Sequence, residues 1–200
     1  MRVDGVRAVA GQPVDPARNV VTISGKSIRP FGTWSTQVIV LNKPAGVVTT
    51  MRDEHGRRNV AHLLPDKPRL FPIGRLDADT TGLLLCTNDG GLATFLAHPS
   101  SEIERTYAVR VDGSLSAEQA AGLKARNVKH HGKGQTSFEV SLFEGKNRQV
   151  RRMCAQLGLR VVGLTRTRFG PVALGKLAPG ATRILTRVER DALEHLRGRA

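Results

Sequence analysis

The stretch "PIGRLDADTTGLLLCTNDG", residues 72–90, carries the side chains best suited to chemistry, with Arg75, Asp77 and Asp79 just before a run of apolar residues. Two carboxylates at this spacing could hold a hard cation for phosphate or sugar chemistry. They could also act as general acid and base, or only cap turns before a strand. The charge of Arg75 disfavours a cation beside it, and for the pair taken alone the turn role carries the most weight.

A fourth interpretation joins Asp77 to Tyr107 and to the basic segment 146–152. An enzyme that acts on a base in RNA must flip the base out of its stack and hold it, usually against an aromatic face. It also needs a charged group at the sugar–base bond and cations for the flanking phosphates. Tyr107 is the only tyrosine of the chain, although an isolated tyrosine is more often plain core and an arginine run more often a solvated face. The combination of Asp77, Tyr107 and the basic segment favours this interpretation, whereas none of them does so alone.

The charge balance points to a polyanionic partner. The 200 residues contain 31 Lys and Arg against 17 Asp and Glu, a formal charge of +14. Such a field attracts nucleic acid first and anionic membrane second, unless it only reflects an arginine-rich proteome. No stretch has the roughly 20 apolar residues of a membrane span, and the start of the chain lacks the apolar core of a signal peptide. Cys86 and Cys154 lie in no C-x-x-C pattern, which indicates a reducing, cytoplasmic location and no metal site.

The elements that must position these side chains follow no regular strand–helix–strand repeat, which predicts an α+β fold. Consecutive apolar residues predict a buried interior strand over 82–89, and alternation predicts strands over 102–111 and 136–145. Further short strands are expected between residues 161 and 186. The other expected elements are a strand at 38–41, a short helix at 59–65, and helices at 91–99, 116–126 and 147–158.

The last of these helices is amphipathic. Gly158 is its expected end. Its apolar stripe comprises Val150, Met153, Cys154 and Leu157, and the opposite side carries Arg148, Arg151 and Arg152.

Four motifs give the chain a family resemblance: "LNKPAGVVTT" (41–50), "GRLDADTTGLLLCTNDG" (74–90), "ERTYAVRV" (104–111) and "EGKNRQVRRM" (144–153). In order and spacing they resemble the pseudouridine synthases of the RsuA-like family, which modify single uridines in bacterial small- or large-subunit ribosomal RNA. The resemblance runs from about Val38 to about Thr186. It implies the pseudouridine synthase fold, a mixed and mainly antiparallel sheet flanked by helices.

The resemblance also implies residue roles. Asp77 is the essential carboxylate at the ribose–uracil junction, either as nucleophile or as base. Tyr107 stacks on the flipped uracil, Arg151 pairs with Asp77, and Arg75 meets the RNA backbone. Asp79 and Asp89 then fill turn roles. The expected RNA contacts are Lys43, Lys146, Asn147, Arg148 and Arg152.

The reaction implied is an isomerisation that needs no cofactor and no metal. The expected partner is ribosomal RNA or a ribosomal subunit precursor, with large-subunit RNA slightly favoured, and the enzyme is expected to act as a monomer. The alternative is a non-catalytic RNA-binding or ribosome-assembly protein that retains the fold. The intact set of Asp77, Tyr107 and Arg151 argues against that alternative.

The ends of the resemblance define three segments. Residues 1–30 resemble the second half of an S4-type RNA-binding domain, residues 31–37 form a linker, and residues 38–200 form the catalytic domain. The first two helices of an S4-type domain are absent, so that the natural chain either begins upstream of Met1 or has lost them. Between Tyr107 and Glu144 the chain is shorter than the subfamily usually runs and lacks a hairpin before "KHHGKGQTSFEV" (129–140), which bears on the choice of RNA site.

Overall fold

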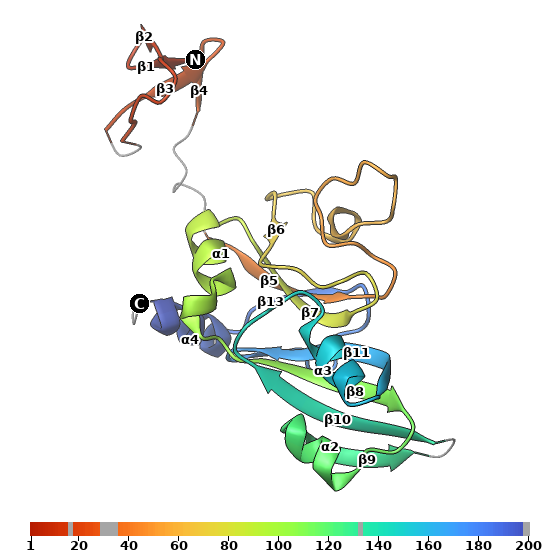
Figure 1. Ribbon diagram of the computed structural model, residues 1–200. Coiled ribbons are helices and arrows are strands. Elements are labelled where there is room, and N and C mark those ends of the chain that lie inside the picture. Colours follow the sequence, from red (N-terminus) through yellow and green to blue (C-terminus); the bar gives the residue numbers. More distant parts are fainter. Residues whose placement is uncertain (16–17, 29–35, 132–133, 198–200) are drawn as a thin grey trace. The chain divides into compact units, whose positions relative to one another are not determined.

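The computed structural model describes residues 1–15, 18–28, 36–131 and 134–197. It divides into two compact units, Met1–Thr36 and Gln37–Ala200, which are seen in Figure 1. Most of the expected linker, residues 31–35 with Trp34, lies outside the described residues.

The N-terminal unit is a small antiparallel sheet. Its described strands are β1 (Arg2–Val3), β2 (Val6–Arg7), β3 (Val21–Ile23) and β4 (Lys26–Ile28), in the order β2-β1-β3-β4. In the described part of this unit Val3 is the buried apolar side chain, whereas Val6, Val9 and Val20 are exposed. So little buried apolar surface contributes little to the stability of this unit. The S4-type identity of residues 1–30 stays a prediction.

The larger unit is built on one sheet, which has nine strands among the described residues. The order is β13-β5-β7-β11-β8-β10-β9, with β6 paired to β7 and β12 to β11. All pairings are antiparallel except that of β7 with β11. The α+β class and the mainly antiparallel sheet are therefore confirmed. The bounds are β5 (Val38–Lys43), β6 (Phe71–Pro72), β7 (Thr81–Thr87), β8 (Arg105–Asp112), β9 (Arg126–His131), β10 (Gln135–Leu142), β11 (Arg160–Phe169), β12 (Val172–Ala173) and β13 (Thr182–Ile184).

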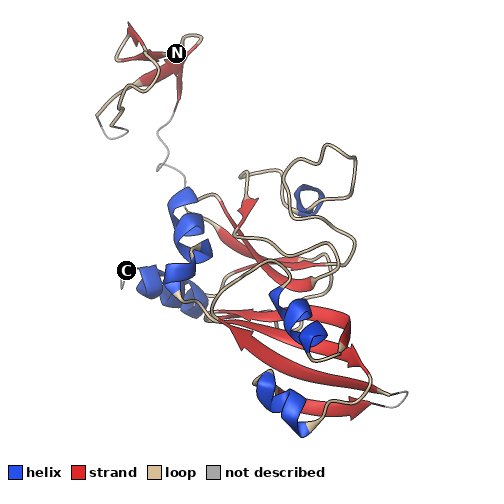
Figure 2. Cartoon of the chain, viewed as in Figure 1, coloured by secondary structure: helices blue, strands red, loops and turns tan. Residues whose placement is uncertain are grey.

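The helices flank this sheet (Figure 2). They are α1 (Gly90–Ala97), α2 (Ala117–Gly122), α3 (Gln149–Gln156) and α4 (Arg187–Arg197), with 3-10 turns η1 (Val60–Leu63) and η2 (Pro99–Ser101). The side chain of Asp89 accepts a hydrogen bond from Leu92 N at the start of α1, which confirms its expected turn role. Ser116 begins α2 in the same way, as expected. Helix α4 is not evident in the sequence pattern, because only Leu193 of this polar helix is buried.

Strands β5 and β7 are buried on both faces, which is why their apolar residues are consecutive. Residues of one face, such as Leu83, pack against α1 and α4. Residues of the other face, such as Leu84, pack under the segment that carries η1. A third cluster joins β8 and β10 to α3 through Val109, Val140 and Cys154. The sheet therefore has two halves, one on either side of β11, and each half packs through its own apolar clusters.

The two halves join where β7 meets β11, and this seam depends on Gly82. The described pairs are Thr81 with Thr165 and Gly82 with Arg166. Gly82 has a φ of +101°, and a Cβ there would lie 2.3 Å from Arg166 O. Only glycine permits the backbones of β7 and β11 to approach this closely. The close approach brings the loop that precedes β7 beside β8.

Two of the longer strands differ from expectation. β11 has ten residues instead of the expected short pieces. Its register shifts at Val161/Gly163 and at Arg166/Arg168 interrupt the alternation that reveals a long strand in a sequence. β9 was not expected, since all of its residues are exposed and it carries no apolar alternation.

Candidate active site

Asp77 lies in the loop between β6 and β7, and the turn that follows β5 pins this loop. Thr49 Oγ1 donates to Leu76 O at 2.6 Å and accepts from Leu76 N at 3.2 Å. Gly46 N donates to Ala78 O at 2.8 Å. The backbone on both sides of Asp77 is therefore fixed by the Lys-Pro motif that precedes it in the sequence.

Lys43 is part of this support, and the expected RNA contact at Lys43 is wrong. Its side chain is fully buried, and Nζ donates to the carbonyl oxygens of Val47 at 2.7 Å, Pro44 at 3.0 Å and Ala78 at 3.4 Å. Burial lowers the pKa of Lys43 to about 8, against the opposing effect of the two loop carboxylates. An ammonium group without exposed surface holds the loop and cannot reach RNA.

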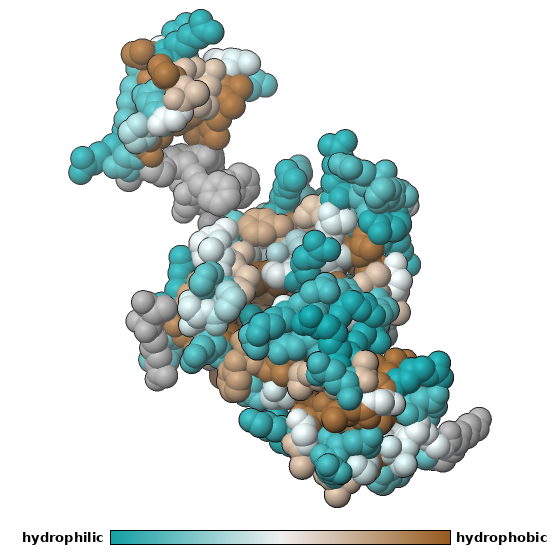
Figure 3. All heavy atoms as spheres, in the orientation of Figure 1, coloured by the Kyte–Doolittle hydropathy of each residue, from teal (hydrophilic) through white to brown (hydrophobic). Residues whose placement is uncertain are grey.

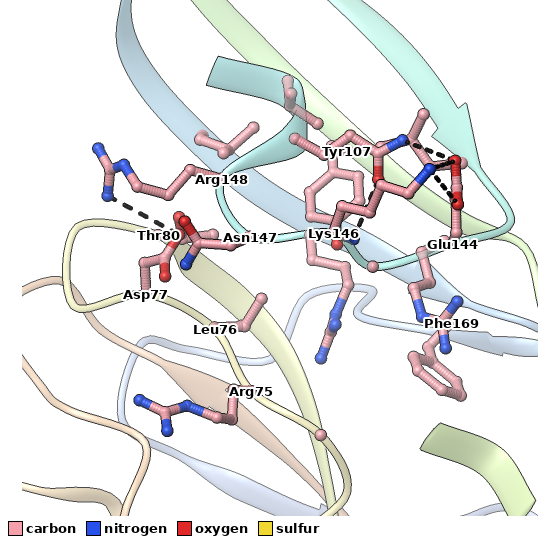
Figure 4. Close-up of a pocket in the computed structure, with 18 of the residues that line it drawn as sticks. Arg75, Leu76, Asp77, Thr80, Tyr107, Glu144, Lys146, Asn147, Arg148 and Phe169 are labelled. Carbon is pink, nitrogen blue, oxygen red and sulfur yellow. Dashed lines mark hydrogen bonds and ion pairs between the residues drawn. The ribbon is translucent and has the colours of Figure 1, made fainter. Parts of the chain in front are cut away.

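A cavity of about 480 Å³ opens beside Asp77 (Figure 4). Asp77 is 36% exposed at its edge, and the half-buried Tyr107 lies between the Asp77 side and the Glu144 side of the view. The cavity brings together six of the side chains expected from the sequence: Arg75, Asp77, Tyr107, Lys146, Asn147 and Arg148.

Arg166 also lines the cavity, although no motif in the sequence singled it out. It pairs directly with Tyr107 across β11 and β8, and directly opposed residues share a face of the sheet. Its side chain is buried, its Nε donates to Leu83 O at 2.7 Å, and among the described residues its Nη2 has no hydrogen-bond partner. A buried cation with an unused N–H favours negative charge nearby. The position of Arg166 two residues after the buried Leu164 is the signal that could have identified it.

Arg105 is a second buried arginine in the cavity wall that was not among the expected site residues. Its guanidinium donates to Ile103 O at 3.1 Å, Phe143 O at 2.8 Å and Leu96 O at 3.3 Å. It lies 5.0 Å from the centroid of the Phe169 ring. Burial lowers its pKa from the usual range, helped by a neighbouring arginine. Arg105 therefore fixes the chain at Phe143, just after β10, from which it continues towards the basic segment 146–152.

The expected pair between Arg151 and Asp77 is wrong: Arg151 instead contacts Asp79, with Nη2 3.3 Å from Oδ2 and donating to Asp79 O at 3.0 Å. Arg148 Nη1 and Nη2 donate to the same carboxylate at 3.1 and 2.9 Å. The hydrogen bond from Arg148 is the main cause that holds the pKa of Asp79 below its usual range. Asp79 is thus more than a turn residue, because its carboxylate points to the start of α3.

These contacts argue against the alternative of a merely solvated arginine face on α3. Arg148 precedes the helix in the left-handed conformation, and Arg151 is only 16% exposed. Arg152 is exposed outside the cavity, and Lys146 Nζ lies 2.8 Å from Glu144 Oε2. Figure 3 shows hydrophilic side chains gathered over α3. RNA contacts by Lys146, Asn147, Arg148 and Arg152 stay predictions.

A second cavity of about 440 Å³ shares Arg75 and Asp77 with the first. Asp53 in its wall is 3% exposed and pairs with Arg57 at 2.7 Å. Hydrogen bonds from the Arg57 side chain and loop backbone lower the pKa of Asp53 to about 2. Since the charge of Asp53 is compensated in this way, Arg52 and Arg75 are the cations of this wall without an ion pair among the described residues.

The structure offers no support for the cation interpretation of Asp77 and Asp79. Among the described residues no group of three or more His, Cys, Asp or Glu side chains could hold a metal ion, and the Asp79 carboxylate is occupied by arginines. In the same residues no helix is long and apolar enough to cross a membrane.

Comparison with known proteins identifies relatives along most of the chain. The model of the family described as RNA pseudouridylate synthase matches residues 37–156. An uncharacterized RNA pseudouridine synthase of Mycobacterium bovis is 41% identical over 203 residues, which cover 92% of this chain and 79% of the relative. The dual-specificity RNA pseudouridine synthase RluF of Escherichia coli K12 is 35% identical over 193 residues, covering 92% and 66%. A crystal structure of a pseudouridylate synthase superposes with a TM-score of 0.69 at 26% identity, covering 96% and 87%.

Proposed function

Because this chain belongs to the RNA pseudouridine synthases, which are isomerases, we propose that it converts one specific uridine of ribosomal RNA to pseudouridine, with large-subunit RNA favoured over small-subunit RNA. The observation that carries the proposal is the single cavity shared by Asp77, Tyr107 and the buried Arg166. A cavity lined by a carboxylate, an aromatic face and a cation is suited to hold a flipped nucleotide.

The reaction exchanges one bond for another. The uridine is flipped into the cavity, Tyr107 stacks on the uracil ring, and Asp77 acts at C1′ of the ribose, as nucleophile or as base. The N1–C1′ bond breaks, the C5–C1′ bond forms, C5 loses its proton and N1 gains one. Atoms and electrons balance within the nucleotide, so the reaction requires no redox partner or group carrier.

The substrate strand then runs past Asp77 towards the second cavity. Arg75 borders both cavities, and Arg52 lies in the wall of the second. Guanidinium groups without an ion pair are suited to phosphodiester oxygens, so these two arginines hold the phosphates next to the target uridine. The charge of +14 supports this assignment, because phosphate neutralisation dominates the affinity of proteins for nucleic acids.

A pseudouridine map of total ribosomal RNA, read as carbodiimide-dependent stops of reverse transcription, tests the proposal. Cells with the wild-type gene, a deletion, and the deletion complemented with Asp77→Asn or with Asp112→Asn are compared. Asp112 pairs with Arg160 away from the cavity, so this variant is the matched control. We expect one stop that vanishes on deletion and returns with Asp112→Asn but not with Asp77→Asn.

Two results would contradict the proposal. If Asp77→Asn restores the stop, Asp77 is not the essential carboxylate. If no stop in ribosomal RNA depends on the gene, the chain acts on another RNA or is a non-catalytic RNA-binding protein.

A further inference from the structure

A loop with an arginine held by an aspartate lies beside the proposed catalytic carboxylate. Residues 49–58 belong to the wide connection between β5 and β6 (Figure 1). The base of this loop is closed, since Val48 N donates to Arg58 O at 3.0 Å and Val60 N donates to Val48 O at 3.1 Å. Side chains of the loop line the second cavity together with Asp77. They are therefore placed next to any RNA strand whose uridine reaches Asp77.

Asp53 organises the loop through both of its carboxylate oxygens. Oδ2 accepts hydrogen bonds from the backbone N–H groups of His55 at 3.1 Å and Arg57 at 2.7 Å. Oδ1 accepts from the Arg57 side chain, at 3.1 Å from Nε and 2.7 Å from Nη2, and Nε also lies 3.3 Å from Oδ2. The Asp53 side chain is 3% exposed, whereas that of Arg57 is 58% exposed. Oδ2 thus fixes the backbone turn, while Oδ1 fixes the direction of an exposed guanidinium.

The other edge of the Arg57 guanidinium is available to a ligand. Nε and Nη2 face Asp53, and within the described part of the chain Nη1 has no hydrogen-bond partner. Arginine recognises phosphate oxygens through N–H groups set in a rigid fork, and a side chain that is already oriented loses less entropy on binding. Three arginines line the second cavity beside three carboxylates, those of Asp53, Glu54 and Asp77. Orientation rather than net charge must therefore select a phosphate here.

We propose that Arg57 binds a phosphodiester group of the substrate RNA and that Asp53 is its positioning residue. This role rests on the proposed function, in which the strand crosses the second cavity while its uridine lies at Asp77. Arg75 borders both cavities, whereas Arg57 lines only the second. The phosphate at Arg57 is therefore farther from the target uridine than the phosphate at Arg75. Arg57 thus extends the contact of the protein with the strand beyond Arg52 and Arg75.

The substitution Asp53→Asn separates positioning from charge. Asn keeps one oxygen for the backbone N–H groups of His55 and Arg57, but its amide nitrogen carries only donors and cannot accept from the Arg57 side chain. The same substitution removes a negative charge, which by itself would strengthen binding to a polyanion. A positioning role predicts the opposite result, weaker binding of RNA, because the guanidinium is no longer held.

Equilibrium binding of a synthetic hairpin that carries the uridine located by the ribosomal RNA map measures these effects. All proteins also carry Asp77→Asn, so that no turnover occurs, and the salt concentration is varied. With Arg57→Gln we expect the Kd to rise about tenfold, the effect of one charge-assisted hydrogen bond. The slope of log K against log salt should become shallower by about 0.7, the value for one phosphate of a single strand.

Asp53→Asn is expected to raise the Kd at least about threefold, the cost of ordering one long side chain on binding. The double variant should match Arg57→Gln, because Asp53 acts only through Arg57. In chains that keep Asp77, both single variants should raise KM and change kcat less than about twofold.

Asp112 and Arg160 are the matched control, since this ion pair lines neither cavity. Asp112→Asn and Arg160→Gln should each leave the Kd within about twofold of the parent value. An unchanged Kd and slope in Arg57→Gln, or tighter binding by Asp53→Asn, would overturn the inference.

A scan of the hairpin with single methylphosphonate linkages, each of which removes the charge of one phosphate, tests the contact with the loop intact. We expect one linkage that weakens binding to the chain with Arg57 about tenfold but does not weaken binding to Arg57→Gln further. If every linkage weakens both proteins equally, Arg57 contacts no phosphate and the inference is wrong. Failure of the proposed function would be distinct, because wild type and Asp112→Asn would then form no pseudouridine in the hairpin.

Discussion

Lys43 and Asp79 illustrate what a residue type alone does not determine. A lysine at the end of an apolar strand in a basic chain is an ordinary expectation for RNA contact, yet its ammonium turns inward to three carbonyl oxygens. An aspartate two residues from another aspartate is an ordinary turn residue, yet it binds Arg148 and Arg151. The sequence proposes Asp77 and Tyr107 as site residues through motif chemistry, and both line one cavity, whereas partners that depend on the path of a loop in three dimensions require the structure.

Replacement of Lys43 by methionine is expected to lower the free energy of unfolding by about 2 kcal/mol, the cost of leaving buried carbonyl oxygens unpaired. Urea denaturation measures the change. Lys176→Met is the matched control, because Lys176 is exposed and its replacement should leave stability within about 0.5 kcal/mol. Equal stabilities of the two variants would show that the three hydrogen bonds of Lys43 add nothing.

At the scale of elements, strands buried on both faces were the easiest to predict. Three consecutive leucines, Leu83 to Leu85, predict the interior strand β7, and the structure has them fully buried. The strand β11 was harder, because its bulges break the alternation, and α4 buries too narrow a stripe to be recognised. Arg166 lies in β11 and was missed together with it. A residue can be assigned to a cavity only when its strand and its face of the sheet are known.

The seam between β7 and β11 is expected to be intolerant of any side chain at Gly82. Gly82→Ala would place a Cβ 2.3 Å from a backbone oxygen, at a φ of +101°. The strands must separate, which should cost about 3 kcal/mol of stability. Thermal unfolding of Gly82→Ala against Gly90→Ala measures this, because a Cβ at Gly90 meets no atom within 4 Å. A Gly82→Ala protein as stable as the control would mean that the seam relaxes without cost.

Across the whole molecule, the C-terminal helix ties distant parts of the larger unit together. Glu189 at its start pairs with Arg183 of β13 at 2.7 Å, and Arg197 at its end reaches Asp89, the cap of α1, at 3.2 Å. The Glu189 side chain is 13% exposed. Its hydrogen bond with Arg183 is the main cause that lowers its pKa to about 2 from the ordinary 4.5.

This pair should make stability depend on pH in the acid range. Because the pKa of Glu189 is lower in the folded chain than in the unfolded one, its contribution is complete above pH 4.5 and is lost as the pH falls towards 2. We expect Glu189→Gln to be less stable than wild type by up to about 2 kcal/mol near neutral pH, with the difference shrinking towards about pH 3. Urea denaturation at both pH values measures it, with Glu118→Gln in the first turn of α2 as the control. If the difference in the free energy of unfolding between Glu189→Gln and wild type stays constant with pH, the pH dependence does not come from the Glu189–Arg183 pair.

The two cysteines have a practical consequence for labelling. Cys86 in β7 and Cys154 in α3 are free and fully buried, and burial raises their thiol pKa to about 12 and about 11. Since the thiolate is the reactive form, neither thiol should react readily with maleimides while the chain is folded. A cysteine introduced at an exposed position such as Arg152 would then be the reactive site, and a fluorophore attached there could report RNA binding without removal of the native thiols.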